Sequence, residues 1–357
     1  MKKKRFCKKI LFVDKIQFGN LTDTLKYCEY LNSQFEITYL CYDRNTPKTV
    51  IKGVRVVYVP FIKNRILRQI VYVGFFIKLA LFFDGFIFIV YHSGCRILKY
   101  ILPWKKMHLD IRTLSVIPDD ISRERQDNDL IKAVKIFNSV SAISTGIIEK
   151  LRKQSNKDIR FLPLGADIIS SNKKAFKSLS LLYVGTLNNR HIIDTVKAVH
   201  RMIINNPSLE IQYDIVGDGE ELCEITHYLE KEGLSSYIKL WGRIKHQDLK
   251  TFFDKCNIGV SYIPIEDYYQ LQPPTKTFEY VFSGLYVIAT KTVENSKIIN
   301  NFNGILIDDN VDSFYNALIY ITRNLKDIDS DVIRQSLNQY SWSNIIKTFL
   351  IPILEKP

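Results

Sequence analysis

Short apolar runs rich in β-branched residues alternate along the chain with amphipathic stretches of helical length. This alternation is typical of parallel α/β folds, in which strands buried on both faces are continuously apolar. In the first half, strands are predicted at residues 9–13, 36–40, 54–59, 86–90, 107–110, 139–143 and 159–162. In the second half, they are predicted at 181–184, 212–216, 238–241, 258–262, 286–289 and 304–307. Helices are predicted between these later strands at 190–204, 221–232, 247–255 and 276–283.

A polar stretch over residues 167–178 separates the two series of strands, as an interdomain linker does. At 357 residues the chain is long enough to bury two cores. We therefore predict two Rossmann-like α/β domains, residues 1–170 and 171–338. The helices of the second domain each follow a strand, so their N-termini are expected at one edge of the sheet, where anions bind.

Three predicted strands of the second half end in a glycine shortly before a helix: Gly185, Gly217 and Gly242. Glycine lets the backbone approach a phosphate closely, and Arg190 after the first of these turns can grip diphosphate oxygens. The loop after Gly242 can lie against a nucleotide base through its backbone groups. Each turn by itself also fits an ordinary strand-to-helix connection, so the inference depends on finding three at matching strand ends.

A fourth pattern lies at residues 273–290, where two prolines precede a helix, Gly284 ends it and an apolar strand follows. The start of this helix presents backbone N–H groups and Lys276. Glu279 lies about one turn in, where its carboxylate can accept hydrogen bonds from two ribose hydroxyls. A diphosphate and a ribose fit there, although an acidic residue near a helix start also fits an ordinary amphipathic helix.

These four patterns occur in an order that resembles the GT-B glycosyltransferases of the family-4 type (glycosyl transferases group 1). Residues 161–167 before the linker and Tyr340-Ser341-Trp342 near the end add to the resemblance. It covers nearly all of the second half and, in the first half, only the architecture and the Asp110-Ile111-Arg112 segment. The resemblance implies two Rossmann-like domains facing each other across a cleft, with a C-terminal helix at 339–357 that packs back on the first domain.

By this resemblance, Arg190 and Lys276 hold the donor diphosphate as catalytic groups, and Glu279 holds the ribose. The other implied substrate-binding positions lie in the glycine turns and at the helix start: Gly185, Thr186, Gly217, Gly242, Arg243, Ile244, Pro274, Thr275 and Thr277. The chain departs from the family twice. Thr186 stands where the family often has an arginine, and Leu271 replaces the first of two glutamates, so the acid that contacts the sugar is not identified.

Candidate residues in the first half are fewer. His108 and Asp110 lie at a predicted strand end and are candidate catalytic residues. Gly19 belongs either to a loop that contacts acceptor and donor or to a plain turn. Residues 127–129 match an acidic triplet that binds manganese in glycosyltransferases of another fold, but their place at the start of a predicted helix suits a solvated acidic face. The resemblance implies that no metal and no cofactor are needed, because in the family cationic side chains and helix N-termini neutralise the leaving diphosphate.

The charge of the chain is uneven. Residues 1–170 hold 30 Lys and Arg against 15 Asp and Glu, whereas the remainder holds 20 against 22. The chain begins with a basic cluster at residues 2–9, and the segment 63–83 is apolar but interrupted by cations. We expect the first domain to dock on an anionic membrane surface, unless segment 63–83 is a helix buried on several sides. No uninterrupted apolar span of about 18 residues is present to cross a bilayer.

The six cysteines form no C-x-x-C pair, which argues against a disulfide framework or a zinc site. We expect a protein of the cytoplasm, or one bound peripherally to the inner face of the plasma membrane. The expected function is retaining, metal-independent transfer of a sugar from a nucleotide-diphosphate donor to a saccharide or lipid-linked acceptor in surface polysaccharide assembly. A nucleotide-sugar 2-epimerase of the same fold and a noncatalytic binding partner are the alternatives. Nucleic-acid binding is not expected, because no recognisable module is present.

Overall fold

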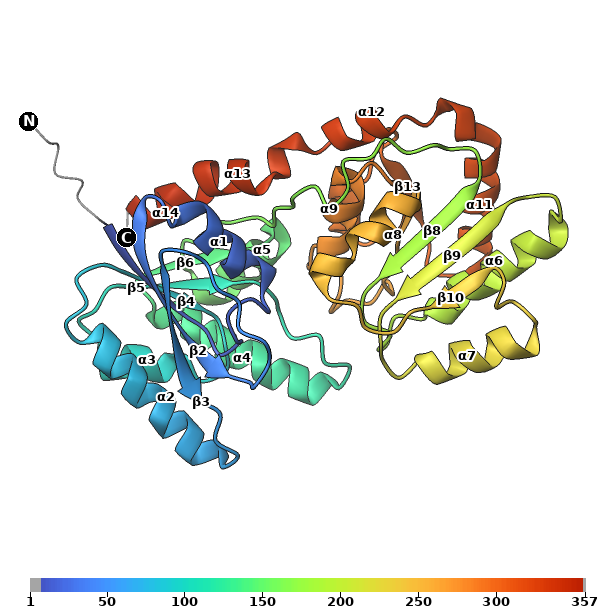
Figure 1. Ribbon diagram of the computed structural model, residues 1–357. Helices are drawn as coiled ribbons and strands as arrows, with labels where there is room; N and C mark the ends of the chain where they lie inside the picture. Colours follow the sequence, from blue (N-terminus) through green and yellow to red (C-terminus); the bar gives the residue numbers. More distant parts are fainter. Residues whose placement is uncertain (1–7, 356–357) are drawn as a thin grey trace, which may run out of the picture. The chain divides into compact units, whose positions relative to one another are not determined.

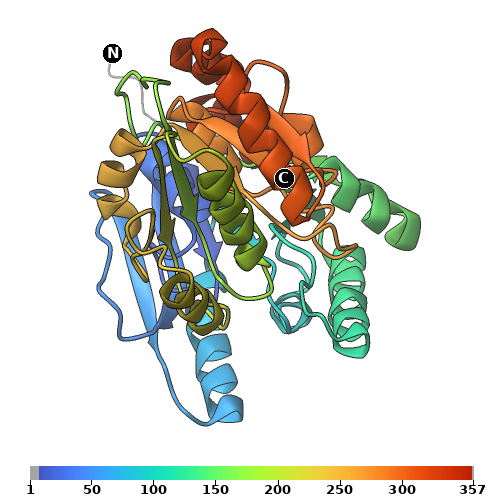
Figure 2. The same cartoon turned by 90° about the vertical axis from the view of Figure 1, so that its right-hand side faces the viewer.

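The computed structural model describes residues 8–355, which fold into two compact units (Figure 1). The first unit is Met1–Leu164 with Trp342–Pro357, and the second is Gly165–Ser341. Each unit holds one parallel sheet with helices on both faces (Figure 1, Figure 2). The basic cluster at the start of the chain lies largely outside the described residues, since only Lys8 and Lys9 are among them.

The sheet of the first unit has seven strands within the described residues, in the order β3-β2-β1-β4-β5-β6-β7. The strands are β1 (Lys8–Val13), β2 (Phe35–Asp43), β3 (Val54–Pro60), β4 (Phe86–Val90), β5 (Met107–Ile111), β6 (Ser139–Ala142) and β7 (Arg160–Phe161). The helices are α1 (Thr22–Leu31), α2 (Arg65–Ala80), α3 (Arg96–Ile101), α4 (Asp120–Ile136) and α5 (Thr145–Ser155).

The centre of this sheet is apolar on both faces, as a parallel strand between two helical layers requires. Ile10 of β1 lies opposite Ile37 of β2 and Phe86 of β4, and the last four residues of β1 are fully buried. The end of the chain belongs to this unit: α13 (Trp342–Ile345), a π-helical turn η4 (Ile346–Leu350) and α14 (Ile351–Glu355). Trp342 packs edge-on against Tyr27 of α1, with ring centroids 5.8 Å apart.

The second unit has a six-stranded sheet in the order β10-β9-β8-β11-β12-β13. The strands are β8 (Leu179–Val184), β9 (Ile211–Val216), β10 (Ile238–Leu240), β11 (Ile258–Ser261), β12 (Tyr286–Thr290) and β13 (Gly304–Ile307). The α-helices are α6 (Ile192–Asn205), α7 (Leu222–Lys231), α8 (Lys250–Lys255), α9 (Thr275–Phe282), α10 (Asn295–Ile298), α11 (Val311–Asn324) and α12 (Ser330–Gln335). The 3-10 turns are η1 (His246–Asp248), η2 (Leu325–Asp327) and η3 (Asn338–Tyr340).

Helices α8 and α9 cover one face of this sheet, while α6 and α11 pack together on the other (Figure 1, Figure 2). Leu181 of β8 pairs with Tyr213 of β9 and with Ile258 of β11, so β8 is central. The five residues of β12 are all buried. The predicted fold class of two Rossmann-like α/β domains is thereby confirmed, and every predicted strand overlaps an observed one.

The observed units begin and end at positions somewhat different from the predicted boundaries of 170/171 and 338/339. Residues 165–170 pack with the second unit, because the backbone N–H of Ser170 donates to Ser283 Oγ at 3.3 Å. Residues 338–341 also stay there, since the N–H of Ala166 donates to the carbonyl of Tyr340 at 3.0 Å. Among the described residues, no helix is long and apolar enough to cross a membrane.

Candidate functional site

The candidate site of the second unit lies where the strand order reverses, between β8 and β11. In open α/β sheets, ligands bind outside the carboxyl ends of the strands at such a point. Gly185, Gly217 and Gly242 follow the adjacent strands β8, β9 and β10. The N–H of Gly185 donates to the carbonyl of Val216 at 3.0 Å, and the N–H of Gly217 donates to that of Gly242 at 2.9 Å. The structure therefore brings the three glycine turns together along one edge.

Two of these glycines are explained by close approach. A Cβ atom at Gly217 would lie 1.8 Å from the carbonyl oxygen of Gly185, so a larger residue would push the two turns apart. A Cβ atom at Gly185 would lie 3.1 Å from Tyr183 Oη and 3.4 Å from Lys276 Nζ. Glycine at 185 thus leaves the lysine room above the end of β8. At Gly242, the φ angle of +64° is the reason for glycine.

Lys276 lies in the first turn of α9 and points back over β8. Its Nζ atom lies 3.9 Å from the centroid of the Tyr183 ring, a cation–π contact. Burial, and next the positive charge of Arg190, lower the pKa of Lys276 well below its usual value. Within residues 8–355, no carboxylate forms an ion pair with this lysine.

Arg190 lies in the loop between β8 and α6, flanked by two residues in the left-handed conformation, Asn189 at φ 50° and His191 at φ 56°. Its guanidinium carbon lies 4.3 Å from the centroid of the Tyr269 ring. The Nη1 atom is buried and has no hydrogen-bond partner in the described part of the chain. Because an unpaired buried cation is costly, Arg190 and Lys276 together form a site suited to an anion.

Glu221 holds the loop that carries Arg190. Its carboxylate accepts hydrogen bonds from the backbone N–H groups of Arg190, His191 (3.0 Å) and Ile192 (2.8 Å). The N-terminus of α6 is thus occupied by a side chain of the protein. The start of α6 is therefore not free to bind an anion at this edge.

The start of α9 is different, because no side chain of the described residues caps it and its first turn contains no acidic residue. Pro274 and Thr275 are half-buried there, while Thr277 is buried. The hydroxyl of Thr277 contacts Ser261 Oγ at 2.6 Å, and its N–H donates to the carbonyl of Pro274 at 3.1 Å. Thr277 therefore anchors the helix from inside, and its buried side chain is not placed to bind a substrate as expected.

Glu279 is buried one turn into α9, and its Oε1 atom lies 3.0 Å from His246 Nε2. His246 begins η1, four residues after Gly242, so this contact joins the proposed ribose group to the loop proposed for the base. Arg243 is exposed and Ile244 half-buried in the same loop, and Thr186 is exposed beside Gly185. Sequence reasoning missed His246, although its place just after the third glycine turn was a usable signal.

The first unit does not bring its predicted catalytic residues to a surface. His108 is buried, and its two ring nitrogens lie 2.8 Å from Ser139 Oγ and Ser141 Oγ. Burial lowers the pKa of His108 to about 3, so the ring is neutral inside the sheet. Both nitrogens are engaged by serine hydroxyls. The structure thus gives His108 a packing role in place of the expected catalytic one.

Asp110 lies beside it, fully buried, and accepts a hydrogen bond from Ser141 Oγ at 2.5 Å. Burial, opposed by the charge of Arg112, raises the pKa of Asp110 to about 6. Arg112 in turn pairs with Asp23 at 2.5 Å. Gly19 is explained by its own turn, since its φ is +96° and a Cβ there would lie 2.1 Å from Thr49 Oγ1.

The acidic triplet at residues 127–129 lies in the middle of α4, not at the start of a helix as expected. Asp127 pairs with Lys150 at 2.9 Å, and Asp129 pairs with Arg96 at 2.7 Å. The two carboxylates therefore serve local ion pairs and do not form a solvated face. Across residues 8–355, no group of three or more His, Cys, Asp or Glu side chains is arranged to hold a metal ion.

The two parallel sheets of the chain match the GT-B fold of solved glycosyltransferases. Sucrose-phosphate synthase from Thermosynechococcus elongatus is similar in structure, with a TM-score of 0.79 at 15% identity over 98% of both chains. A glycosyltransferase from Rickettsia africae gives 0.75 at 13% identity, again over 98% of both chains. The HepE protein of Anabaena, solved in complex with UDP and glucose, gives 0.76 at 12% identity over 98% of this chain and 100% of that one.

Residues 178–324 of the second unit match the family described as glycosyl transferases group 1. The matched range contains the three glycine turns, Arg190, Lys276 and Glu279. The resemblance found in the sequence, to group 1 glycosyltransferases of the GT-B fold, is thereby confirmed. No curated protein sequence matches the chain.

Proposed function

We propose that the protein transfers a sugar from a nucleotide-diphosphate donor to a hydroxyl of a saccharide or lipid-linked acceptor, with retention of configuration and without a metal ion. The transfer would take place at the cytoplasmic side of a membrane, as a step in surface polysaccharide assembly. Retention and the type of acceptor follow from the resemblance to the family. The donor follows from the glycosyltransferase domain and from the geometry of the second unit.

The observation that carries the proposal is the pair of cations at the reversal of strand order. Lys276 and Arg190 lie at the carboxyl end of β8, close enough for the arginine to lower the lysine pKa. Neither has a carboxylate partner in the described part of the chain, and Arg190 Nη1 is buried and unpaired. A diphosphate bound between them would satisfy both charges, and two cations on one leaving group supply the neutralisation that a metal ion gives in other enzymes.

The remaining contacts follow along the donor. The uncapped start of α9 would add backbone N–H groups to the diphosphate. The Glu279 carboxylate would accept hydrogen bonds from the two ribose hydroxyls. His246, which contacts this carboxylate in the structure, would either keep that contact or be displaced by the ribose. The loop at residues 242–244 would contact the base. UDP-sugars are the donors to test first, because the Anabaena protein of this fold was solved with UDP and glucose.

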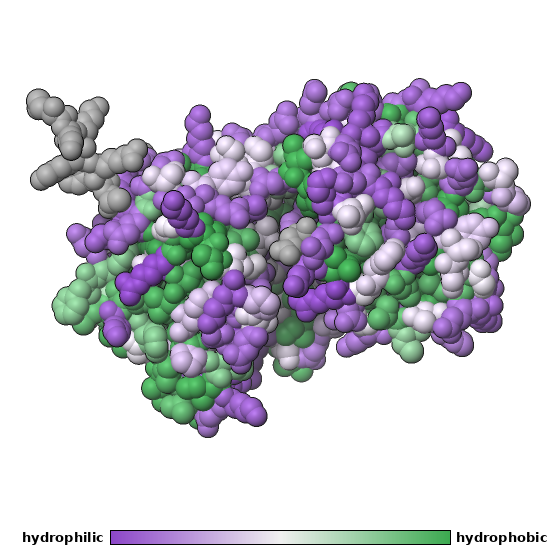
Figure 3. All heavy atoms as spheres, in the orientation of Figure 1, coloured by the Kyte–Doolittle hydropathy of each residue, from purple (hydrophilic) through white to green (hydrophobic). Residues whose placement is uncertain are grey.

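Membrane docking is proposed for the first unit. Exposed apolar side chains on α2 include Ile66 (74% exposed) and Ile70 (62%), while Tyr72 and Phe76 on the same helix are buried. Figure 3 shows hydrophobic side chains gathered on the surface over α2. The helix thus has one buried side and one apolar side exposed to solvent, and the surplus of Lys and Arg in residues 1–170 would attract anionic headgroups.

The test is calorimetric titration with nucleoside diphosphate. Arg190→Ala, Lys276→Ala and Glu279→Ala should each lose about 1.5 to 3 kcal/mol of binding free energy, the size of charge-assisted hydrogen bonds. Lys239→Ala removes an exposed cation of β10 and should bind like the wild type, as should Leu271→Ala. Wild-type affinity in the Glu279 variant would remove the ribose assignment, and wild-type affinity in both cation variants would end the proposal for the diphosphate.

A further inference from the structure

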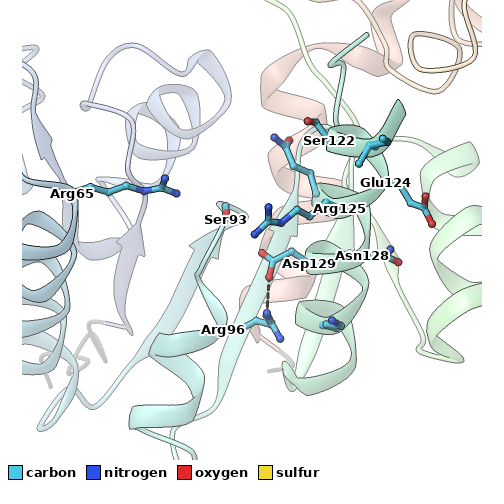
Figure 4. Close-up of a pocket in the computed structure, with 11 residues that line it drawn as sticks. Arg65, Ser93, Arg96, Ser122, Glu124, Arg125, Asn128 and Asp129 are labelled. Carbon is cyan, nitrogen blue, oxygen red and sulfur yellow. Dashed lines mark hydrogen bonds and ion pairs between the residues drawn. The ribbon is translucent and has the colours of Figure 1, made fainter. Parts of the chain in front are cut away.

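The first unit has a basic hollow of about 800 Å³ at its own reversal of strand order, between β1 and β4. It lies between the start of α2, the loop after β4, the start of α3 and the outer side of α4 (Figure 4). Its lining is mostly polar and holds four cations against two acids: Arg65, Ser93, Arg96, Ile121, Ser122, Glu124, Arg125, Gln126, Asn128, Asp129 and Lys132.

The charges in the basic hollow are only partly balanced. Asp129 pairs with Arg96 at 2.7 Å. Arg65, Arg125 and Lys132 have no ion pair with any described residue. Arg65 and Arg125 point toward one another across the hollow, although like charges repel (Figure 4). Such a pair is stabilised by an anion placed between them, and guanidinium groups match phosphate oxygens in geometry.

A second hollow, of about 770 Å³, adjoins the first and shares Arg65 and Ser93 with it. This apolar hollow is lined by exposed side chains of α2 and α3, with Ile66, Ile70 and Ile97 all more than 40% exposed. Two of its four cations lie over one aromatic ring: the guanidinium carbon of Arg68 is 4.4 Å and that of Arg44 5.0 Å from the centroid of the Phe61 ring. No acidic residue lines it.

The two hollows meet at the carboxyl ends of the central strands. Lys15 follows β1, and its Nζ donates to the carbonyl of Ser93, which follows β4, at 2.9 Å. This is the position at which a doubly wound sheet binds a ligand. The molecule that fits the combined surface has an anionic group at one end and a long apolar part at the other, because the charged and apolar linings are contiguous.

We propose that the two hollows form the acceptor site for a lipid that carries a phosphate or diphosphate, with the phosphate between Arg65 and Arg125 and the lipid chain along Ile66, Ile70 and Ile97. This assignment rests on the proposed transferase function and names the chemistry of its acceptor. The phosphate would fix the position of the acceptor, so that its sugar or hydroxyl end is free to accept a transferred sugar.

The test uses probes that separate head from tail: farnesyl diphosphate, inorganic diphosphate and uncharged farnesol. Calorimetry is done on the Lys276→Ala background, so that diphosphate cannot bind strongly at the donor site. Farnesyl diphosphate should bind at least about tenfold more tightly than inorganic diphosphate or farnesol. Arg125→Ala should weaken both diphosphate probes about tenfold or more. Ile70→Ser should weaken farnesyl diphosphate alone.

The control is Lys153→Ala, which removes an exposed cation of α5 in the same unit and outside both hollows. Farnesyl diphosphate binding that is unchanged in Arg125→Ala, or lowered equally in Lys153→Ala, would overturn the proposal. Equal affinity for inorganic and farnesyl diphosphate, with no effect of Ile70→Ser, would show a site for free phosphate and would also overturn it. Donor binding is measured separately in the Arg125→Ala protein with intact Lys276, so that its absence counts against the transferase proposal only.

Discussion

Replacing Glu221 with alanine is expected to weaken donor binding, although Glu221 is itself negatively charged. The carboxylate accepts from three successive backbone N–H groups and holds Arg190 between two residues in the left-handed conformation. Without it, the loop is free to relax and Arg190 loses its position over Tyr269. On charge alone, removing a carboxylate near a diphosphate would tighten binding. A net loss therefore isolates the positioning effect.

The magnitude follows from what Arg190 is expected to contribute. A charge-assisted hydrogen bond contributes about 1.5 to 3 kcal/mol, which corresponds to roughly 10- to 150-fold in the dissociation constant. Glu221→Ala should lose most of this contribution. Losing a helix cap costs about 1 kcal/mol of stability, so the variant is expected to fold. Glu221 is expected to act only by positioning the Arg190 guanidinium. The double variant with Glu221→Ala and Arg190→Ala should therefore bind the donor no more weakly than Arg190→Ala alone.

The assay is a double-mutant cycle read by titration calorimetry with UDP. Glu224→Ala is the matched control, because it removes an exposed carboxylate in the first turn of α7, the helix that directly follows Glu221. The control should stay within about twofold of the wild type. Unchanged or tighter binding in Glu221→Ala, or effects of Glu221→Ala and Arg190→Ala that simply add, would refute the positioning role.

Three further outcomes are expected. Donor binding should weaken as pH rises, at a lower pH than an ordinary lysine would give, because Lys276 must be protonated to pair with the diphosphate and its pKa is lowered. Calorimetry in buffers of different ionisation enthalpy should show proton uptake that Lys276→Ala abolishes, and equal uptake in both proteins would contradict this. Transfer should persist in excess EDTA and in Asp127→Asn, whereas a loss restored by manganese would show metal dependence. The whole chain should sediment with phosphatidylglycerol vesicles at low salt and not at high salt. Ile66→Ser on α2 should weaken this sedimentation, whereas Ile204→Ser on α6 should not. Equal sedimentation of the two variants would argue against docking through α2.

The sheets could be predicted because strands buried on both faces are continuously apolar. The runs Met107–Ile111 and Tyr286–Thr290 are entirely buried, as strands covered on both faces by helices are. The glycine turns could be predicted because the close packing of the two turns requires glycine. The backbone of Gly185 lies too close to that of Gly217 for a side chain at position 217. Local composition carries this information.

Contacts between distant loops were not accessible in the same way. Glu221 and Arg190 are 31 positions apart in the sequence. No local pattern around either residue predicts that the first and second glycine turns lie side by side. His246 and Glu279 are separated by 33 positions and meet for the same reason. His108 was misjudged because a strand residue can face a ligand or the interior, and only its neighbours Ser139 and Ser141 on β6 determine that it is held inside.

The most direct test of the donor site is a crystal structure of the chain with a nucleoside diphosphate, chosen by thermal-shift screening of UDP, GDP and ADP. A ligand at about 100 times its dissociation constant should add roughly 2.7 kcal/mol of stability, enough to identify the right base. The expected structure has diphosphate oxygens within hydrogen-bond distance of Lys276 Nζ and the Arg190 guanidinium, and both ribose hydroxyls on the Glu279 carboxylate. A nucleotide bound elsewhere, or one at this edge that leaves Lys276, Arg190 and Glu279 without contact to it, would contradict the proposed function.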